Sequence, residues 1–467
     1  MTRADGRAME DRDVKLLAWT LVLCAGFGLM LWSHYGLGTL DASAPCRDGR
    51  IILGVDASAA PEGTTAVPAT VRLLPMRRFA EAMVSQGGLR ARQRNGIRAY
   101  CSELVLRASP EALGLTSDLL ASGRLPAPGA DEVLAGGQAT HTDTLRIAGR
   151  KMTVTGVLWP DAALLAHAYL VPPDPSVADL FAPGDAAVQR AAVVPMTPDE
   201  ARDKDILKAL GKAWPPKERF TTVAPYLRSE QHRFWLYLAG MAMMLVGGSG
   251  LLIGAWRALA GCRLWRSLGD PLAEMQRRRG LLWGVHLAYF GAVVVAAAVV
   301  YGLPEVQAFL MAIIKASIQS GQGPLALAGK AYGSGNVAYA AAVTFGVNFG
   351  VGSLLSITVP SMILPGSGAL VALFRAVMWG GLLGPSTVDM AALMLPHSWT
   401  LLLEGEAYIL ATFFALLIPI HLFDGRLGSF GRRLGRALLL NLEGCILVAI
   451  VLGVAAVYEA IEVIAQM

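Results

Sequence analysis

The sequence predicts a polytopic α-helical membrane protein with about seven transmembrane helices and an inserted α+β domain. Of its 467 residues, 54% are hydrophobic and only 16% are charged, whereas soluble domains carry about 25% charged residues. Several apolar runs approach the roughly 20 residues that a helix needs to cross a bilayer. Between the first two runs lie about 190 residues of ordinary soluble composition, which is long enough for a domain with its own core.

The first apolar run covers residues 16–37 and follows four basic residues, Arg3, Arg7, Arg12 and Lys15. Such a segment is either a membrane anchor or a cleaved signal peptide, and Ala42-Ser43-Ala44 has the small-residue pattern of a cleavage site. The apolar run is longer than the usual core of a signal peptide, and Pro45 would directly follow the cut. We therefore expect an uncleaved anchor, with a signal peptide as the alternative.

Six further apolar runs predict the remaining crossings: 234–256, 281–302, 337–359, 369–384, 399–423 and 437–457. The run 369–384 is short for a crossing, so it either spans the bilayer, sheltered by its neighbours, or re-enters it. Seven crossings are the prediction and six the alternative.

Arginine placement predicts the orientation. The connection 257–280 carries six arginines and 424–436 carries four, whereas 304–336 has only Lys315 and Lys330 and 385–396 has no basic residue. These counts alternate as seven crossings require, with the N-terminus cytoplasmic and the large domain periplasmic, in a bacterial inner membrane. The net charge of +5 is thus a topology signal, and no nucleic-acid partner is expected.

The chain divides into four predicted parts: a cytoplasmic N-terminus with the first helix (1–40), the periplasmic domain (41–233), the second helix with its basic connection (234–280), and a membrane domain (281–467). Strand-like runs in the periplasmic domain are 50–55, 132–135, 145–147, 152–158, 168–171 and 191–194, and 145–158 reads as a β-hairpin turning at Gly149-Arg150. Helices are expected at 76–85 and 197–213. Cys46 and Cys101 both fall in this domain and form the one plausible disulfide, with two unpaired thiols as the alternative.

The sequence contains no common phosphate-binding, catalytic or metal-binding motif. The run from Gly323 to Lys330 has one residue too many for a phosphate-binding loop and no Ser or Thr after the Lys. No nucleophile elbow, His-Glu-x-x-His helix or Cys-x-x-Cys pair occurs, and the seven histidines have no ligand spacing. We therefore expect no enzyme activity, no cofactor and no metal site.

Charged residues inside apolar runs are the strongest candidates for function, because they are costly in a bilayer. The predicted intramembrane polar cluster comprises Arg375, His397, Glu404, Glu406 and Tyr408. On a helix, His397, Glu404 and Tyr408 share one face. Arg375 and Glu404 are the expected ion pair, acting either in a proton or substrate path or as a clamp between helices.

Two other segments suggest contacts with partners. The cytoplasmic run 264–279 could be an interfacial helix or a coupling helix for a motor; its candidate coupling residues are Arg263, Arg266, Asp270, Glu274, Arg277, Arg278 and Arg279. Gly346-x-x-x-Gly350 predicts a close-packing face, within the chain or as a seam between copies in a homo-oligomer. The end of the chain, Tyr458-Glu459-Ala460-Ile461-Glu462, is expected to leave the membrane as an exposed amphipathic tail.

Two stretches resemble known families. Gly123-Arg124, Glu132-Val133 and Val154-Thr155-Gly156-Val157 resemble the periplasmic core domain of MacB-type transporters and FtsX-like permeases, over about residues 119–158. From about residue 281 the chain resembles the stage II sporulation protein M family, on Asn336-Val337-Ala338, the glycine-rich fourth span and Leu395-Pro396-His397. That family usually has a Gly after Pro-His and then an early Glu; here Ser398 replaces the Gly and Glu404 comes late.

The resemblances imply roles that composition does not. Members of the second family occur beside ATPases in circular-bacteriocin export and immunity, and beside peptidoglycan hydrolases during engulfment. The first hypothesis is therefore a transmembrane subunit of an ABC-type export or mechanotransmission complex, with a separate ATPase subunit and other membrane or periplasmic subunits as partners. The alternatives are an envelope scaffold for cell-wall hydrolases and an ion-coupled secondary transporter.

Overall fold

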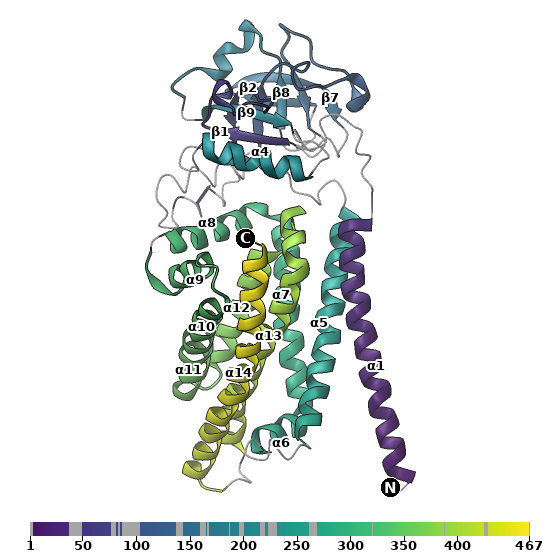
Figure 1. The fold of residues 1–467 in the computed structure, drawn as a ribbon, viewed down its shortest axis with the longest axis vertical. Helices are drawn as coiled ribbons and strands as arrows, with labels where there is room; N and C mark the ends of the chain where they lie inside the picture. Colours follow the sequence, from purple (N-terminus) through teal and green to yellow (C-terminus); the bar gives the residue numbers. More distant parts are fainter. Residues whose placement is uncertain are drawn as a thin grey trace. The chain divides into compact units, whose positions relative to one another are not determined.

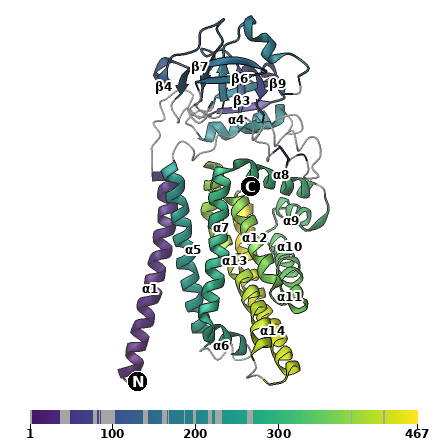
Figure 2. The ribbon, with the colours of Figure 1, turned by 180° about the vertical axis from the view of Figure 1, so that it is seen from behind.

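The structure, a computed structural model, describes residues 3–36, 49–75, 81–82, 85, 103–136, 143–158, 165, 168–185, 187–195, 200–214, 220–222, 231–260, 269–319, 321–386, 388–424 and 428–466. The chain forms two compact units (Figures 1 and 2). The helical unit comprises Met1–Leu37, His232–Leu303 and Ile313–Met467, and the sheet unit comprises Gly38–Gln231 with Pro304–Ala312.

The described part of the sheet unit contains one ten-stranded mixed sheet, in the order β10-β1-β9-β2-β3-β8-β5-β7-β4, with β6 paired to β7. Only the pairs β3–β8 and β5–β7 are parallel. The strands are β1 Gly49–Leu53, β2 Val67–Leu73, β3 Leu104–Arg107, β4 Leu120–Gly123, β5 Glu132–Ala135, β6 Thr144–Ile147, β7 Arg150–Leu158, β8 Ala168–Val171, β9 Val188–Pro195 and β10 Phe220–Thr222.

The predicted hairpin is confirmed, with β6 and β7 antiparallel. Its turn lies one residue earlier than expected, at Ala148 and Gly149, whose φ angles of 49° and 88° are both positive. Two positive φ angles are what a tight two-residue hairpin turn requires, because they match the twist of the strands. Strands β2, β3, β4 and β10 were not predicted.

Alternation along the strands divides the core between the two faces of the sheet. Leu104 and Leu106 of β3 belong to one buried cluster, and Val105 between them belongs to the other. Helix α4 (Glu200–Ala213) is followed by Trp214, which packs with Ile52 of β1 in a third cluster. The sheet therefore buries both of its faces.

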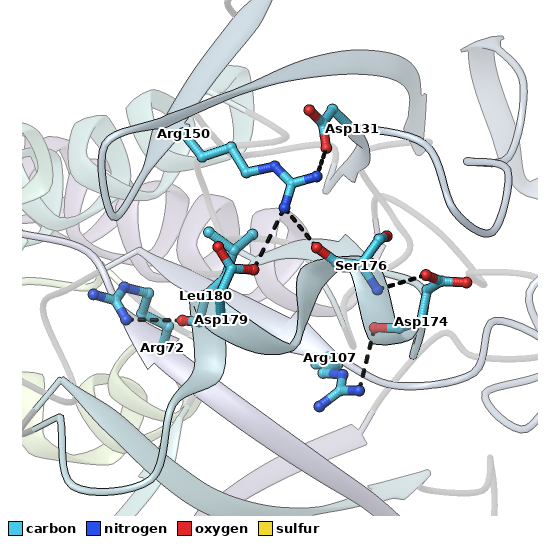
Figure 3. Close-up of polar contacts among 8 residues, drawn as sticks. All are labelled: Arg72, Arg107, Asp131, Arg150, Asp174, Ser176, Asp179 and Leu180. Atoms are coloured by element: carbon cyan, nitrogen blue, oxygen red, sulfur yellow. Dashed lines mark hydrogen bonds and ion pairs between the residues drawn. The ribbon is translucent and has the colours of Figure 1, made fainter.

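Three arginines hold the short 3-10 helix η5 (Pro175–Phe181) against the sheet (Figure 3). Arg72 of β2 donates to the Leu180 carbonyl at 2.8 Å, Arg107 of β3 donates to the Asp174 carbonyl at 3.3 Å, and Arg150 of β7 donates to the Ser176 carbonyl at 2.6 Å. The bond to Leu180 satisfies a carbonyl group in the last turn, where a helix leaves carbonyls unpaired; the other two add a second donor to the start of η5.

Six described helices of the helical unit are long and apolar enough to cross a membrane. The helices of this unit are α1 Arg3–Leu31, continued by η1 Trp32–Gly36; α5 Gln231–Ala260; α6 Gly269–Arg277; α7 Arg279–Gly302; α8 Pro304–Gln319, shared with the sheet unit; α9 Gly323–Gly333; α10 Val337–Phe345; η7 Gly346–Thr358; α11 Val359–Ile363; α12 Ser367–Leu383; α13 Val388–Phe423; and α14 Phe430–Gln466. The short apolar run is α12, which packs against α7 and α13 and runs opposite to its neighbours η7–α11 and α13 (Figures 1 and 2).

Helix α1 lies beside α5 in both views (Figures 1 and 2) because glycines allow close contact. A Cβ atom added at Gly240 would lie 2.7 Å from the Gly26 carbonyl oxygen, and one at Gly247 would lie 2.8 Å from the Leu23 Cα atom. Small residues let apolar helices approach closely in a bilayer. The glycine contact thus lies between the first two spans. It does not involve Gly346 and Gly350, where an added Cβ would meet no atom within 4 Å.

Candidate functional site: polar groups buried around helix α13

Helix α13 lies inside the helical unit, with 89% of its most apolar window buried. It contacts α14, α7, α12, η7 and α1. Side chains that point away from α13 therefore meet protein on nearly every side. Its polar residues cannot reach water easily, so each needs a partner from a neighbouring helix.

Glu406 has both carboxylate oxygens occupied. Trp256 Nε1 of α5 donates to Oε1 at 2.6 Å, and His286 Nε2 of α7 lies 2.7 Å from Oε2. The side chains of Glu406 and His286 are 0% and 1% exposed. His286 Nδ1 lies 2.8 Å from the Leu282 carbonyl oxygen.

These contacts determine how many protons the His286–Glu406 pair holds. A carbonyl oxygen only accepts, so His286 Nδ1 carries a proton. The contact between Nε2 and Oε2 needs a second proton, which belongs either to the imidazole or to the carboxyl group. In both cases the pair is neutral as a whole and fully hydrogen-bonded, which is the favourable arrangement for a buried acid.

Glu404, two residues away, is 2% exposed and has different neighbours. Asn348 Nδ2 of η7 donates to its Oε1. Glu459 of α14, which is only partly buried, interacts electrostatically with Glu404 and with the Tyr332 hydroxyl of α9. Among the described side chains, no hydrogen-bond partner reaches Glu459 Oε2.

The predicted ion pair between Arg375 and Glu404 is not found in the described structure. Arg375 of α12 instead donates to the Tyr408 hydroxyl at 2.6 Å, and its guanidinium carbon lies 4.2 Å from the centre of the Tyr408 ring. The sequence indicated that each charge needs a partner, but it did not show that an aromatic ring and hydroxyl could serve Arg375. The buried Tyr289 hydroxyl of α7, electrostatically coupled to Arg375 and Glu404, has no described partner.

The π-helix η7 contributes two residues beside Glu404 and Arg375. They are the hydrogen-bond donor Asn348 and the small residue Gly352. Wide helical turns of this kind are frequent at functional sites. A Cβ atom added at Gly352 would lie 2.9 Å from the Tyr408 hydroxyl and 3.2 Å from Arg375 Nη2. Gly352 therefore makes room for the Arg375–Tyr408 contact, while Gly346 lines an open groove of about 680 Å³ beside α9.

His397 lies near the start of α13 and pairs with Glu462 of α14. Its Nδ1 is 3.0 Å from Glu462 Oε1, and Thr400 Oγ1 donates to Glu462 Oε2 at 2.7 Å. Trp379 of α12 stacks on the His397 ring. The prediction of an exposed tail was wrong at these positions: α14 continues to Gln466, and Glu462 is only 7% exposed. It stays buried because its acceptors are satisfied by α13.

The candidate coupling segment contains an ion cluster at the opposite end of α13. His421 Nε2 lies 3.0 Å from Glu274 Oε1 of α6. Arg277 and Arg278 also bond Glu274. Burial raises the pKa of Glu274, but hydrogen bonds from Arg277, His421 and Arg278 outweigh that effect and bring its pKa to about 2.

Two other predicted coupling residues that the structure describes take no part in this cluster. Asp270 and Arg279 are exposed, and Arg263 and Arg266 lie outside the described residues. Cys46 and Cys101 also lie outside them, so their pairing stays a prediction. Among the described cysteines, Cys24 and Cys445 are free thiols.

In the sheet unit, the charged residues at and next to Gly123-Arg124 and Glu132-Val133 form ion pairs within the unit. Arg124 forms a fork with Glu132 through Nη1 and Nη2, and the Ala127 N–H donates to the same carboxylate at 2.9 Å. The Arg124 hydrogen bond, with that of Ala127, lowers the pKa of Glu132. Arg150 pairs with Asp131 (Figure 3). These residues fix the loop before β5 and the turn before β7, which is a structural role.

No protein-family model matches the chain, and no curated protein sequence matches it. Sequence reasoning selected Glu404, Glu406, His397, Arg375 and Tyr408 as one cluster, whereas the structure divides them among four groups of contacts. It missed their partners Trp256, His286, Asn348, Glu459 and Glu462, and it missed His421 as the partner of Glu274. The spacing of Glu459 and Glu462, one helical turn apart after an apolar run, is the signal that could have revealed two of them.

Proposed function

We propose that this chain is the transmembrane subunit of an ABC-type export or mechanotransmission complex, driven by a separate ATPase that docks on α6. The supporting observation is the link between α6 and α13. Glu274 joins this short helix to His421 at the end of the longest buried helix. A force on α6 would therefore reach the helix that carries Glu404, Glu406 and His397.

Helix α6 also has a free side. Pro271, Leu272 and Met275 are buried, while Asp270, Ala273 and Gln276 are exposed. A short amphipathic helix with a polar side turned outward suits a protein partner on the cytoplasmic side. The arginine distribution predicts that side for this connection.

The test is photo-crosslinking in cells from a crosslinking amino acid placed at Gln276, with the same residue at lipid-facing Leu370 as the control. Leu370 is 72% exposed and lies on apolar α12. The proposal expects Gln276 alone to capture a protein with a nucleotide-binding loop. It also expects His421→Ala to preserve that capture while reducing the response of the captured protein's ATP hydrolysis to this chain.

Capture of no ATPase from Gln276, or equal capture from Leu370, would contradict the proposal. An ATPase whose hydrolysis responds fully to the His421→Ala chain would leave the docking intact and refute the link through α13.

A second candidate, ion-coupled transport, is favoured by one observation. Glu404 is a buried carboxylate, and no described cation is ion-paired with it. Such groups often mark ion or proton paths in membranes. Proton-driven uptake into vesicles containing the purified chain without an ATPase would favour this candidate over the first.

A further inference from the structure

We propose that the open groove between α9 and η7 binds one anionic phospholipid, with its phosphate at Lys330 and an acyl chain along α10 and η7. The groove lies within the helical unit, where α9 contacts α10 (Figures 1 and 2). Its volume of about 680 Å³ falls in the range of small-molecule sites. The site stands independently of the ATPase proposal, because it requires only residues of this chain and a bilayer around its apolar helices.

The walls of the groove select an occupant that is apolar along most of its length. The described lining residues are glycine, alanine, proline, leucine and valine, with Lys330 as the exception. Apart from Lys330, none of these side chains carries a hydrogen-bond donor or acceptor. A polar solute would lose its hydrogen bonds to water on entering and gain few in return, which is costly. A hydrocarbon chain has no such bonds to lose.

Gly346 keeps the groove wide. It has helical backbone angles, φ −59° and ψ −41°, and glycine in a helix is less favourable than alanine. A Cβ atom added at Gly346 would meet no atom within 4 Å, whereas one added at Gly352, on the same π-helix, would lie 2.9 Å from the Tyr408 hydroxyl. Packing within the chain therefore explains Gly352 but not Gly346, and a ligand in the groove explains Gly346.

The groove continues onto an outward face of its membrane span. Only 33% of the most apolar window of Val337–Ile363 is buried, against 89% for the span that contains most of α13. Beyond Val351, which lines the groove, Leu355 and Val359 follow at four-residue steps and are 60% and 38% exposed. Apolar side chains on the outside of a membrane span face the hydrocarbon of the bilayer. A chain in the groove thus passes directly into the lipid phase.

Lys330 gives the groove its charge. It lies in the last turn of α9 and is exposed, and no described acid forms an ion pair with it. Asn336, six residues later, caps the start of α10, so Lys330 lies near the end of the span, where headgroups lie. Basic pockets between membrane helices bind anionic headgroups, and lysine binds phosphate as a point charge. Charge complementarity therefore favours an anionic phospholipid over a neutral one.

The experiment uses photoreactive phosphatidylglycerol, with the reactive group on an acyl chain, and the full chain in phosphatidylcholine vesicles. Photoreactive phosphatidylcholine at the same mole fraction is the comparison, and mass spectrometry locates the labelled peptides. We expect phosphatidylglycerol to label residues 343–351 about tenfold more strongly, the factor that a hydrogen bond to a charged group contributes. Lys330→Gln should remove this preference. Lys151→Gln, which removes the same charge from exposed β7 of the sheet unit, should keep it.

Gly346→Leu fills part of the groove and should lower labelling by both probes to the level of lipid-facing α12, where Leu370 is 72% exposed. Gly291→Leu on α7 is the matched control, since a Cβ there also meets no atom within 4 Å, and it should leave the labelling unchanged. Val347→Phe fills the groove from the next lining position and replaces Gly346→Leu if that variant does not fold.

Three results would overturn the proposal. The first is equal labelling of the groove and of α12 in the native chain, which would mean contact with bulk lipid alone. The second is a preference for phosphatidylglycerol that survives Lys330→Gln. The third is an unlabelled groove together with a dimer, seen by size-exclusion chromatography, that Gly346→Leu abolishes; this would assign the groove to a second copy of the chain.

Discussion

The two sides of α13 differ in how they handle a buried acid. Toward α5 and α7, Glu406 is enclosed by an indole and an imidazole that occupy both oxygens. Toward η7, Glu404 accepts one hydrogen bond, from the Asn348 side-chain amide. Only Gly405 separates the two acids in the sequence. Burial alone therefore does not decide how a membrane carboxylate is held: Glu406 has a partner on each oxygen, whereas Glu404 has a single described hydrogen-bond donor.

The largest expected effect comes from removing Glu406, the acid whose two oxygens both have partners. Glu406→Ala leaves Trp256 Nε1 without an acceptor and His286 Nε2 without a partner, and removal of one partner of a buried pair costs about 3–5 kcal/mol. We expect this loss in the free energy of unfolding, measured by reversible unfolding of the full chain in mixed micelles. A loss below that of Glu404→Ala would contradict the structural role of Glu406.

Glu404→Ala should cost less, about 1–2 kcal/mol, because one hydrogen-bond partner is lost from Asn348. The same unfolding measurement checks this prediction. A loss equal to or larger than that of Glu406→Ala would contradict it.

A substitution at Gly405 tests how tightly α13 packs against α7. A Cβ atom there would lie 2.6 Å from Phe290 Cε1 and 3.3 Å from Tyr289 Cε1. Gly405→Ala should therefore destabilise by about 1–3 kcal/mol through overpacking. Gly453→Ala on α14 is the control, since its Cβ would meet nothing within 4 Å, and it should be neutral or slightly stabilising.

The smallest effect concerns Glu274, a carboxylate outside the membrane-spanning helices. Its pKa of about 2 is below the ordinary value of 4.5, so the stability it contributes is present above pH 4.5 and is lost as pH falls toward 2. A spin label at Gln276 should report α6 as immobile at neutral pH and increasingly mobile only below pH 4.5. A spin label whose mobility increases between pH 5 and pH 8 would contradict the lowered pKa of Glu274.

The sequence predicted much of the architecture because apolar length and strand alternation are local signals. The apolar runs and the hairpin at β6–β7 follow from such signals, as does the presence of charged residues inside apolar runs at 375, 404 and 406. The partners could not be predicted, because they depend on which helices touch. Arg375 lies on the helix that precedes α13, yet it binds Tyr408 rather than an acid of α13. Glu404 interacts instead with Glu459, a residue of α14 that comes much later in the sequence.

The central claim is that His286 and Trp256 occupy both oxygens of Glu406 and so hold α13 against α7 and α5. A double-mutant cycle with Glu406→Ala and His286→Ala, measured by reversible unfolding of the full chain, tests it directly. The double variant is expected to lose clearly less free energy of unfolding than the sum of the two single variants, because each single change already removes the same contact. Losses that simply add would contradict the claim.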